Sequence, residues 1–414
     1  MPNTGLLSIF NIRRYLIFLY GVSICFGTFA LVGSSRNFSL PFILAILYMA
    51  SLLPLLDRLP SVLYQYGRFL RLPFIFLVLL YIMNVLYVNE YNVAIISIPL
   101  WSCFAMFVLM LIHDTYDRKA ITLCIYGFMV GATILSILFT LGIGVYVELG
   151  VVLEEGERMS MFGQNQNELG LLMTNGISIV LMVIIFYDRF NLKASRIIAI
   201  VPIILMGSLL FASASRAAFV SLLASLIIII FMHKTKNGFT RFVLLLAGFI
   251  GLWYGFQTMA ESDGIMYDRI MTTIESSNSS GRSDIWKALL PRTMEHPMFG
   301  VGQTGYAKIS HESLTGFVNN MYEYGYSPHN VLIEVFAYTG IIGLFVMMLF
   351  WWRIGSSAIN CYKRDNNLVP LLLILPIIAS IMTGQVLASK VAWLSYAYII
   401  TIAFQHKSPN KRLL

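Results

Sequence analysis

Apolar residues run through this sequence in long stretches that are separated by short polar segments. Most stretches are roughly 16–24 residues long, about the length that an α-helix needs to cross the hydrocarbon core of a bilayer. The pattern predicts an all-α polytopic membrane protein with about 12 transmembrane helices. The predicted spans cover residues 15–33, 39–56, 72–88, 93–112, 120–143, 167–187, 197–212, 217–232, 242–258, 334–352, 368–383 and 391–404.

The seventh and eighth spans come from one apolar run, residues 197–232, which is too long for a single crossing. Ser213-Ala214-Ser215-Arg216 interrupts this run, and we place a turn there. The prediction is therefore two short helices joined by a polar turn.

Two segments between the predicted spans are longer than a simple connection requires. Residues 144–166 are acidic, and residues 259–333 form a loop far longer than usual. The chain is therefore divided into spans 1–9 (1–258), the large loop (259–333), and spans 10–12 with a cytoplasmic tail (334–414). Long loops of this kind usually carry function.

The large loop itself is predicted to contain a helix. Ser, Asn and Gly at 276–281 mark a turn, and the helix is expected over 283–296, where Pro297 ends it. Trp286 and neighbouring apolar residues give the helix one apolar face, so we expect it to lie along the membrane surface.

The charge composition supports a membrane protein and predicts its orientation. Charged residues make up only 12% of the chain, about half of the share in soluble domains, which excludes a soluble enzyme, a disordered tail and a secreted disulfide scaffold. With the N-terminus inside, most of the 28 Lys and Arg fall in cytoplasmic segments, and most of the 20 Asp and Glu fall outside. Both termini are therefore predicted to be cytoplasmic, with any chemistry at the outer face. The net charge of +8 then faces anionic lipid headgroups, so no nucleic-acid partner is expected.

Two arginines on the predicted outer face are candidates for binding an anion. Arg216 interrupts a nearly uncharged stretch, where a cation is costly unless it is paired or functional; snorkelling to the headgroups is the alternative. Arg282 follows the turn at 276–281, and its planar fork of donors suits phosphate oxygens. An ordinary solvated loop arginine is the simpler interpretation of Arg282 alone.

His329 is a candidate base, because it stands in Tyr326-Ser327-Pro328-His329-Asn330 directly before the tenth span. A helix N-terminus disfavours imidazolium, which leaves a neutral ring able to accept the proton of an attacking hydroxyl. A capping histidine at the interface is the structural alternative. Asn330 is expected to orient the turn. Glu334 faces an early turn of the tenth span and is a candidate partner for the residues of the site. Trp286 is expected to anchor at the interface or to pack on sugar or lipid.

Other familiar signals fail. Residues 300–305 fit a dinucleotide fingerprint by their letters, but they lie in an outer loop with no buried strand before them, so we reject that site. The sequence has no His-Glu-x-x-His, paired Cys-x-x-Cys or Asp-x-Asp, and neither a metal nor another cofactor is predicted. The first outer loop, 34–39, lacks a carboxylate, which disfavours a glycosyltransferase with an acidic base in that loop.

Several motifs become informative in combination. In chain order they are Gly-x-Asn-x-Asn (163–167), Ser-x-Ser-Arg-Ala-Ala (213–218), Ser-Gly-Arg-Ser-Asp-Ile-Trp (280–286), Pro-Met-Phe-Gly-Val-Gly (297–302) and His-Asn-Val-Leu-Ile-Glu-Val-Phe-Ala-Tyr-Thr-Gly-Ile-Ile-Gly-Leu (329–344). This series resembles the O-antigen ligase and Wzy-type polymerase superfamily of bacterial membrane glycosyltransferases. The clear match covers about 160–345, and the first five spans match only in hydropathy.

The resemblance implies a glycan donor carried on undecaprenyl pyrophosphate and transferred as a block to an acceptor sugar at the outer face of the bacterial inner membrane. In such proteins arginines bind the pyrophosphate, and a histidine is proposed to activate the acceptor. Carried over, Arg216 and Arg282 hold the diphosphate, and His329 acts as the base. The acceptor is a lipid-linked repeat unit for a polymerase or the lipid A core for a ligase. The motifs do not separate the two, and we favour the polymerase because that activity occurs in more kinds of bacteria.

A transporter or flippase is the competing class, since such proteins also have about twelve spans. A transporter would carry polar residues near the midplane of several helices, whereas the polar residues here concentrate in outer loops. A scaffold without catalysis is a third alternative, which loss of glycan transfer from a single substitution would exclude.

Overall fold

The computed structural model describes residues 9–29, 39–90, 93–149, 157–185, 200–232, 282–315, 325–383 and 387–405. The predicted ninth span, the turn at 276–281 and most of the first outer loop lie outside these ranges.

Helices dominate the described part of the chain, as expected from the apolar runs. Their bounds are α1 (Ile9–Ile24), α2 (Leu40–Leu52), the 3₁₀ helix η3 (Leu53–Arg58), α3 (Leu59–Leu86), α4 (Val93–Tyr116), α5 (Ala120–Thr140), α6 (Gln166–Ile185), α8 (Ile200–Ala212), α9 (Arg216–Met232), α12 (Arg282–Thr293), α13 (Gly302–Leu314), α14 (Val331–Asp365), α15 (Val369–Thr383) and α16 (Lys390–Gln405). One antiparallel hairpin joins β1 (Val145–Leu149) to β2 (Glu157–Met161), with Val145 opposite Met161.

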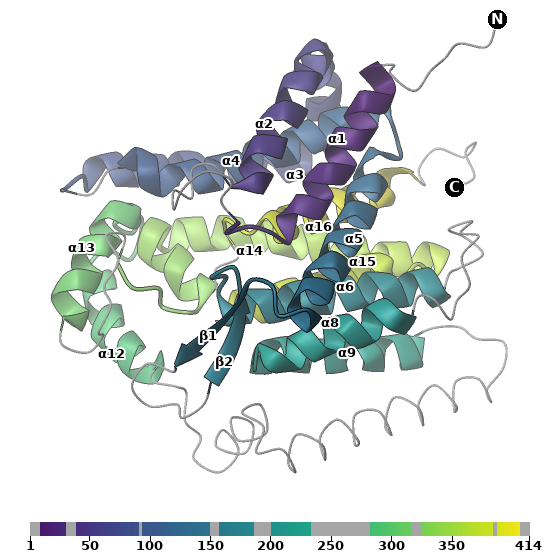
Figure 1. Cartoon of the computed structure of the whole chain (residues 1–414). Coiled ribbons are helices and arrows are strands. Elements are labelled where there is room, and N and C mark those ends of the chain that lie inside the picture. Colours follow the sequence, from purple (N-terminus) through teal and green to yellow (C-terminus); the bar gives the residue numbers. More distant parts are fainter. Residues whose placement is uncertain are drawn as a thin grey trace, which may run out of the picture.

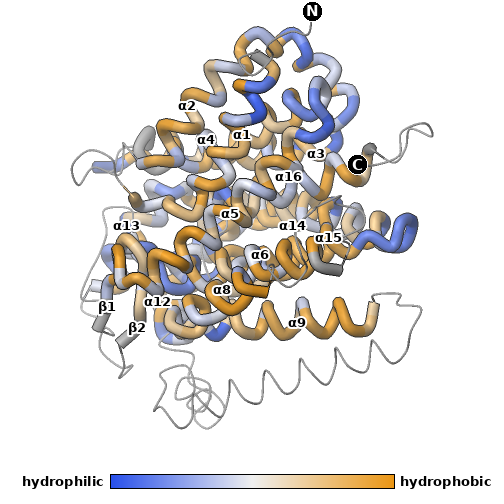
Figure 2. Tube along the Cα trace, turned by 45° about the vertical axis from the view of Figure 1, so that its right-hand side comes forward, coloured by the Kyte–Doolittle hydropathy of each residue, from blue (hydrophilic) through white to orange (hydrophobic). Residues whose placement is uncertain are grey.

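The helical content and hydropathy agree with an all-α membrane protein. Four described segments are long and apolar enough to cross a membrane: Leu40–Leu86, Ser97–Tyr116, Ala120–Thr140 and Val331–Asp365. Helices α8, α9, α15 and α16 are shorter but also apolar, and Figure 2 shows α8 and α9 hydrophobic along nearly their whole length. The count of twelve spans and the side on which each loop lies stay predictions.

Several predicted helix ends are wrong. Helix α3 begins at Leu59 rather than near residue 72, and α14 continues to Asp365, well beyond residue 352. Both helices continue past their apolar part through charged residues such as Arg68 and Arg353. Arginine has a high helix propensity, so the end of an apolar run does not end the helix. Helix α1 is shorter than the predicted span 15–33 at its C-terminal end. It ends at Ile24, and the apolar residues directly after it form turns.

Helices α1 and α5 approach each other at backbone distance. A Cβ atom added to Gly127 of α5 would collide with the carbonyl oxygen of Phe18, and one added to Gly21 of α1 would collide with that of Cys124. Small residues permit such close approach between membrane helices, where packing rather than hydrophobicity drives association. This contact fixes α1 to the bundle.

Gly127→Ala is expected to destabilise the protein by about 1–3 kcal/mol, because the helices must separate to admit the methyl group. Gly207→Ala in α8 is the matched control, since a Cβ there meets nothing within 4 Å. Thermal unfolding of the detergent-solubilised protein measures both. Equal midpoints for the two variants would contradict the close packing of α1 on α5.

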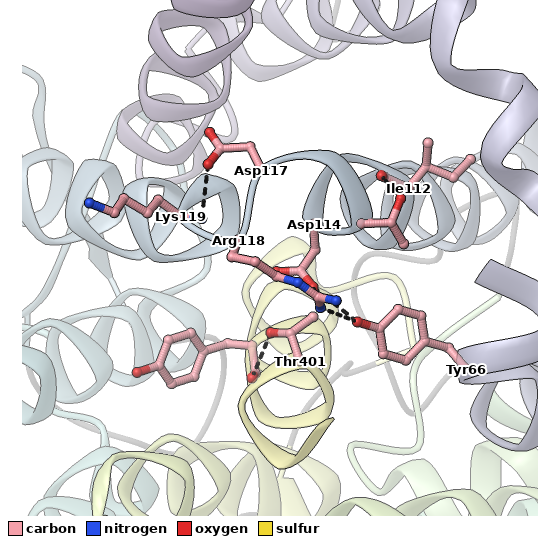
Figure 3. Close-up of polar contacts among 9 residues, drawn as sticks. Tyr66, Ile112, Asp114, Asp117, Arg118, Lys119 and Thr401 are labelled. Atoms are coloured by element: carbon pink, nitrogen blue, oxygen red, sulfur yellow. Dashed lines mark hydrogen bonds and ion pairs between the residues drawn. The ribbon is translucent and has the colours of Figure 1, made fainter. Parts of the chain in front are cut away.

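A polar cluster ties α1, α3 and α4 together around the α4–α5 connection. Figure 3 shows its part around Tyr66, Asp114 and Arg118. Arg14 donates two hydrogen bonds to Asp117, and Arg118 bonds both Asp114 and the hydroxyl of Tyr66. Burial raises the pKa of Asp117, but the Arg14 hydrogen bond and the Lys119 amide outweigh it and hold this pKa below its ordinary value. We interpret this cluster as a structural clamp at the end of the helices that the sequence places inside.

The hairpin, α12 and α13 gather together beside the helical bundle, on the left in both Figure 1 and Figure 2. The sequence predicted neither the hairpin nor α13. The predicted loop helix exists as α12, but it ends at Thr293 rather than at residue 296.

Helix α14 is broken near its start, and the break receives the segment before α13. Gly340 has φ 61° and ψ −163°, and a Cβ there would collide with the backbone of Met298. The Val301 amide donates to the carbonyl of Ala337 (2.9 Å), and the Ile341 amide donates to that of Pro297 (2.8 Å). The glycine is therefore required both for its conformation and for the close approach of a second chain segment.

Candidate functional site

The polar turn before Arg216 lies where the sequence predicted it. Ala214 adopts a left-handed conformation with φ 49°, and Arg216 is the first residue of α9. Ser213 and Ser215 are fully buried; the Ser213 hydroxyl donates to the Leu210 carbonyl (2.6 Å), and Ser215 accepts from the Ala218 amide. The serines therefore shape the turn that starts α9, which is a role that the sequence analysis did not assign to them.

The Gly-x-Asn-x-Asn motif places the start of α6 against that turn. The side-chain oxygen of Asn165 accepts from the amides of Asn167 (2.9 Å) and Glu168, which is an N-cap for α6. One turn further on, a Cβ added to Gly170 would lie 2.8 Å from the Ser213 hydroxyl oxygen. The α8–α9 turn and Arg216 are thus fixed at the end of α6 that follows the hairpin.

Helix α12 presents Arg282 as its first residue and Trp286 one turn later. The Trp286 indole Nε1 donates to the carbonyl oxygen of Pro328 at 2.7 Å. This bond crosses 42 residues of sequence and fastens the start of α12 to the segment that carries His329. This hydrogen bond gives Trp286 a structural contact with the His329 segment, while its anchoring at the interface or packing on sugar or lipid stays a prediction.

His329 is held in an unusual backbone conformation beside Arg282. Its φ of 50° lies in the left-handed region, and its amide donates to the Ser327 hydroxyl at 3.2 Å. Burial lowers the pKa of His329 to about 4, and the positive charge of Arg282 contributes in the same direction. With this pKa the ring is neutral near pH 7, and the causes are burial and the Arg282 charge. The role of His329 as a base stays a prediction.

Asn330 rather than His329 is the N-cap of α14. Its side-chain oxygen accepts from the amides of Leu332 (2.9 Å) and Ile333 (3.3 Å). The expectation that Asn330 orients this turn fits these bonds, since they fix the start of α14 immediately after His329.

A tyrosine network supports the His329 segment from behind. The ring of Tyr326 meets that of His329 edge to face, with centroids 5.5 Å apart. The carbonyl of Tyr326 accepts from the Tyr306 hydroxyl (2.6 Å), and its amide donates to the Ser310 hydroxyl (2.7 Å). Sequence analysis missed Tyr306 and Ser310 because both lie on α13, which it did not predict.

Glu334 belongs to the same network through Tyr338 rather than through His329. Its Oε1 accepts from the Tyr338 hydroxyl at 2.9 Å, and Tyr338 packs edge to face on Tyr306. The other oxygen, Oε2, is buried without a hydrogen-bond partner among the described residues. A supporting position for Glu334 agrees with this geometry.

The glycine-rich stretch at 300–305 runs into the start of α13. Gly302 of the glycine-rich stretch begins α13, and the segment before it pairs with the break in α14. Within the described ranges, no group of three His, Cys, Asp or Glu side chains could hold a metal ion. Whether the protein needs a metal is left to the experiment below.

Trp286→Phe tests whether the Pro328 hydrogen bond positions His329. We expect about tenfold faster deuterium exchange at the His329 amide, because one hydrogen bond to a buried carbonyl is lost. Trp351→Phe is the matched control, since it removes an indole hydrogen bond to Tyr396 far along α14. An equal exchange rate of the His329 amide in both variants would contradict a positioning role for Trp286.

The fold and the site define a helical membrane protein in which an arginine and a neutral histidine come together from distant segments. A family model described as O-Antigen ligase matches residues 201–348, which include Arg216, Arg282 and His329. An O-antigen ligase of Pseudomonas aeruginosa is 29% identical over 186 residues, covering 44% of this chain and 40% of that relative. The chain thus matches less than half the length of this relative.

These two matches support the resemblance to the O-antigen ligase and Wzy-type polymerase superfamily that the motifs indicated.

Proposed function

We propose that this protein transfers a glycan from an undecaprenyl diphosphate carrier to a sugar hydroxyl at the outer face of the inner membrane. The observation that carries the proposal is the meeting of Arg282 and His329, which are 47 positions apart in the sequence and are joined through the Trp286–Pro328 hydrogen bond. An anion-binding cation beside a neutral base suits a reaction in which a diphosphate leaves and a hydroxyl attacks.

Arg282 and Arg216 would bind the diphosphate and stabilise the charge that develops as the glycosidic C–O bond breaks. A guanidinium offers paired donors that match phosphate oxygens, and it needs no metal ion to offset their charge. Arg216 is the first residue of α9 and Arg282 is the first residue of α12. In the proposed reaction the two arginines would reach the leaving group from these separate elements.

His329 would accept the proton of the acceptor hydroxyl as its oxygen forms the new bond to the anomeric carbon. Attack opposite the leaving diphosphate inverts that carbon, which NMR analysis of the product linkage can test. A base with a pKa of about 4 is weak, but a bound diphosphate would neutralise the Arg282 charge that helps to lower this pKa. Donor binding would therefore strengthen the base only when the reaction is ready to proceed.

Two acceptors are to be compared, because the roles proposed for Arg216, Arg282 and His329 would be the same for either acceptor. The two matches carry the description of an O-antigen ligase, which makes the lipid A core the acceptor to test beside the lipid-linked repeat unit. The sequence analysis favoured the repeat unit, so the two acceptors serve as separate arms of one assay.

The deciding experiment is glycan transfer in proteoliposomes with EDTA present, using undecaprenyl-diphosphate-linked glycan as donor and each acceptor in turn. Transfer to one acceptor supports the proposal and identifies the subclass. A parent protein that is inactive with both acceptors, yet moves the lipid-linked glycan across the bilayer, would replace the proposal with the transporter alternative. Activity that EDTA abolishes and added Mg²⁺ restores would contradict metal-independent catalysis.

A further inference from the structure

A polar pocket opens at the other end of α12 from Arg282. It has a volume of about 370 Å³ and lies between the end of α3, the end of α12 and one side of α13. The volume falls within the range of small-molecule sites. Arg292 in the pocket wall lies ten positions after Arg282 along α12, a distance of about 15 Å along the helix axis.

The charges of the pocket balance one another. Arg292 and Lys308 both face Glu312, at 3.9 and 4.0 Å, and Glu295 adds a second carboxylate to the lining. Two cations are thus matched by two acids, which disfavours an anionic ligand such as a free phosphate. The lining instead offers hydrogen-bond donors and acceptors side by side, which suits a neutral ligand rich in hydroxyl groups.

An aromatic ring adds an apolar surface to this polar lining. Tyr87 is half-buried at the end of α3, and its hydroxyl shares a hydrogen bond with His296 Nδ1 at 2.9 Å. The two rings meet edge to face with centroids 5.2 Å apart, which holds the tyrosine in place. A ring with one apolar face beside polar groups matches a pyranose, which has an apolar C–H face and a rim of hydroxyls.

The walls of the pocket are fixed before any ligand binds. Asn84 is fully buried, and its side-chain oxygen accepts from the Gln303 amide at 2.5 Å. Its carbonyl accepts from the Thr304 hydroxyl (3.1 Å), while Asn89 donates to the Thr304 carbonyl (2.8 Å). These bonds lock α13 onto the end of α3, and a preformed site loses less entropy on binding.

We propose that this pocket, formed by Tyr87, Arg292, His296, Lys308 and Glu312, binds sugar units of an oligosaccharide at a distance from the reacting bond. The proposal deepens the proposed function, on which its biological role rests. The Arg282 end of α12 would hold the diphosphate while the far end holds part of a glycan a few sugar units away. Either the donor glycan or the acceptor glycan can supply these units.

Direct binding tests the pocket without relying on transfer. The full chain carrying His329→Ala, in nanodiscs, is titrated by calorimetry with two probes. One is core oligosaccharide released from lipopolysaccharide, and the other is repeat-unit oligosaccharide released from the lipid carrier. Tyr87→Ala is expected to weaken binding of one probe about tenfold, whereas Tyr87→Phe, which keeps the ring, should stay within about threefold of the parent. Glu312→Gln provides a second variant that leaves α3 untouched, and a severalfold loss is expected there.

Tyr64→Ala is the matched control, because this tyrosine also lies on α3 but is 95% exposed near the opposite end of that helix. Equal affinity in the parent, Tyr87→Ala and Glu312→Gln would overturn the pocket, as would an equal loss in Tyr64→Ala. The probe that loses affinity tells whether the donor or the acceptor glycan occupies the pocket.

Failure of the pocket and failure of the proposed function give different results. A parent that transfers glycan, with the same KM for both substrates in the pocket variants, would overturn the pocket and keep the function. A parent that transfers nothing, yet binds an oligosaccharide in a manner that depends on Tyr87, would support the pocket and remove the function.

Discussion

Arg282→Ala is expected to lower glycan transfer by about 10²–10³-fold, the effect of removing one group that stabilises developing charge in a transition state. Arg282→Lys should recover only part of the rate, since an ammonium keeps the charge but lacks the planar fork. Transfer is measured in proteoliposomes at matched protein levels, as initial rates at saturating and subsaturating donor.

Lys287→Ala is the control for Arg282, because it removes a cation from the same helix. Lys287 is largely exposed and pairs with Asp284 at 3.2 Å, so its loss should change transfer less than about threefold. Parent-like transfer by Arg282→Ala, or an equal loss in Lys287→Ala, would contradict a specific diphosphate contact at Arg282.

His329→Asn is expected to lower the rate of transfer by about 10²–10⁴-fold, the usual contribution of a general base. Asparagine is chosen because His329 has φ 50°, and asparagine tolerates this left-handed conformation better than most residues. Binding of the lipid diphosphate should persist, since Arg282 and Arg216 remain. The control is His311→Gln, which removes a histidine that lies on α13 rather than in the His329 segment. This variant should retain nearly full activity. Loss of donor binding in His329→Asn would point to a structural role.

The pH dependence provides a second test of His329 as the base. A base acts when deprotonated, so its contribution is lost as the pH falls through its pKa, which is about 4 before donor binds. The kcat/KM of the parent should therefore show no titration of this group between about pH 6 and 8. Donor binding adds negative charge beside Arg282 and raises this pKa, so the acidic limb of kcat should lie at higher pH than that of kcat/KM. Arg282→Ala should move the limb of kcat/KM upward as well. If the acidic limbs of the parent kcat, the parent kcat/KM and the Arg282→Ala kcat/KM fell at the same pH, the coupling between Arg282 and His329 would be contradicted.

Much of the helical framework follows from the sequence because apolar length is a strong local signal. The turn between α8 and α9 was predicted from one short polar interruption at 213–216, and it lies there in the structure. The ends of α3 and α14 were not predicted, because their charged residues stay helical outside the apolar region. The hairpin and α13 were missed because their short segments lack strong periodicity and depend on long-range contacts such as those from Asn84.

The candidate site shows the same division. Arg216, Arg282 and His329 were recognisable in the sequence by residue type and by their order in the motifs. Their supporting groups were not, since Tyr306 and Ser310 carry no signal until α13 folds against the His329 segment. Trp286 was noticed, but its partner Pro328 lies 42 residues away, and no local pattern joins them.

By itself, the sequence determined the class of this protein and its candidate residues, because hydrophobic length, charge distribution and motif order are properties of the chain. Only the tertiary structure decided that Arg282 stands beside His329, that burial and this arginine keep the ring neutral, and that a charge-balanced pocket lies at the other end of α12. Each of these depends on residues far apart in the chain, and their meeting is set by packing and hydrogen bonds that form only when the helices assemble.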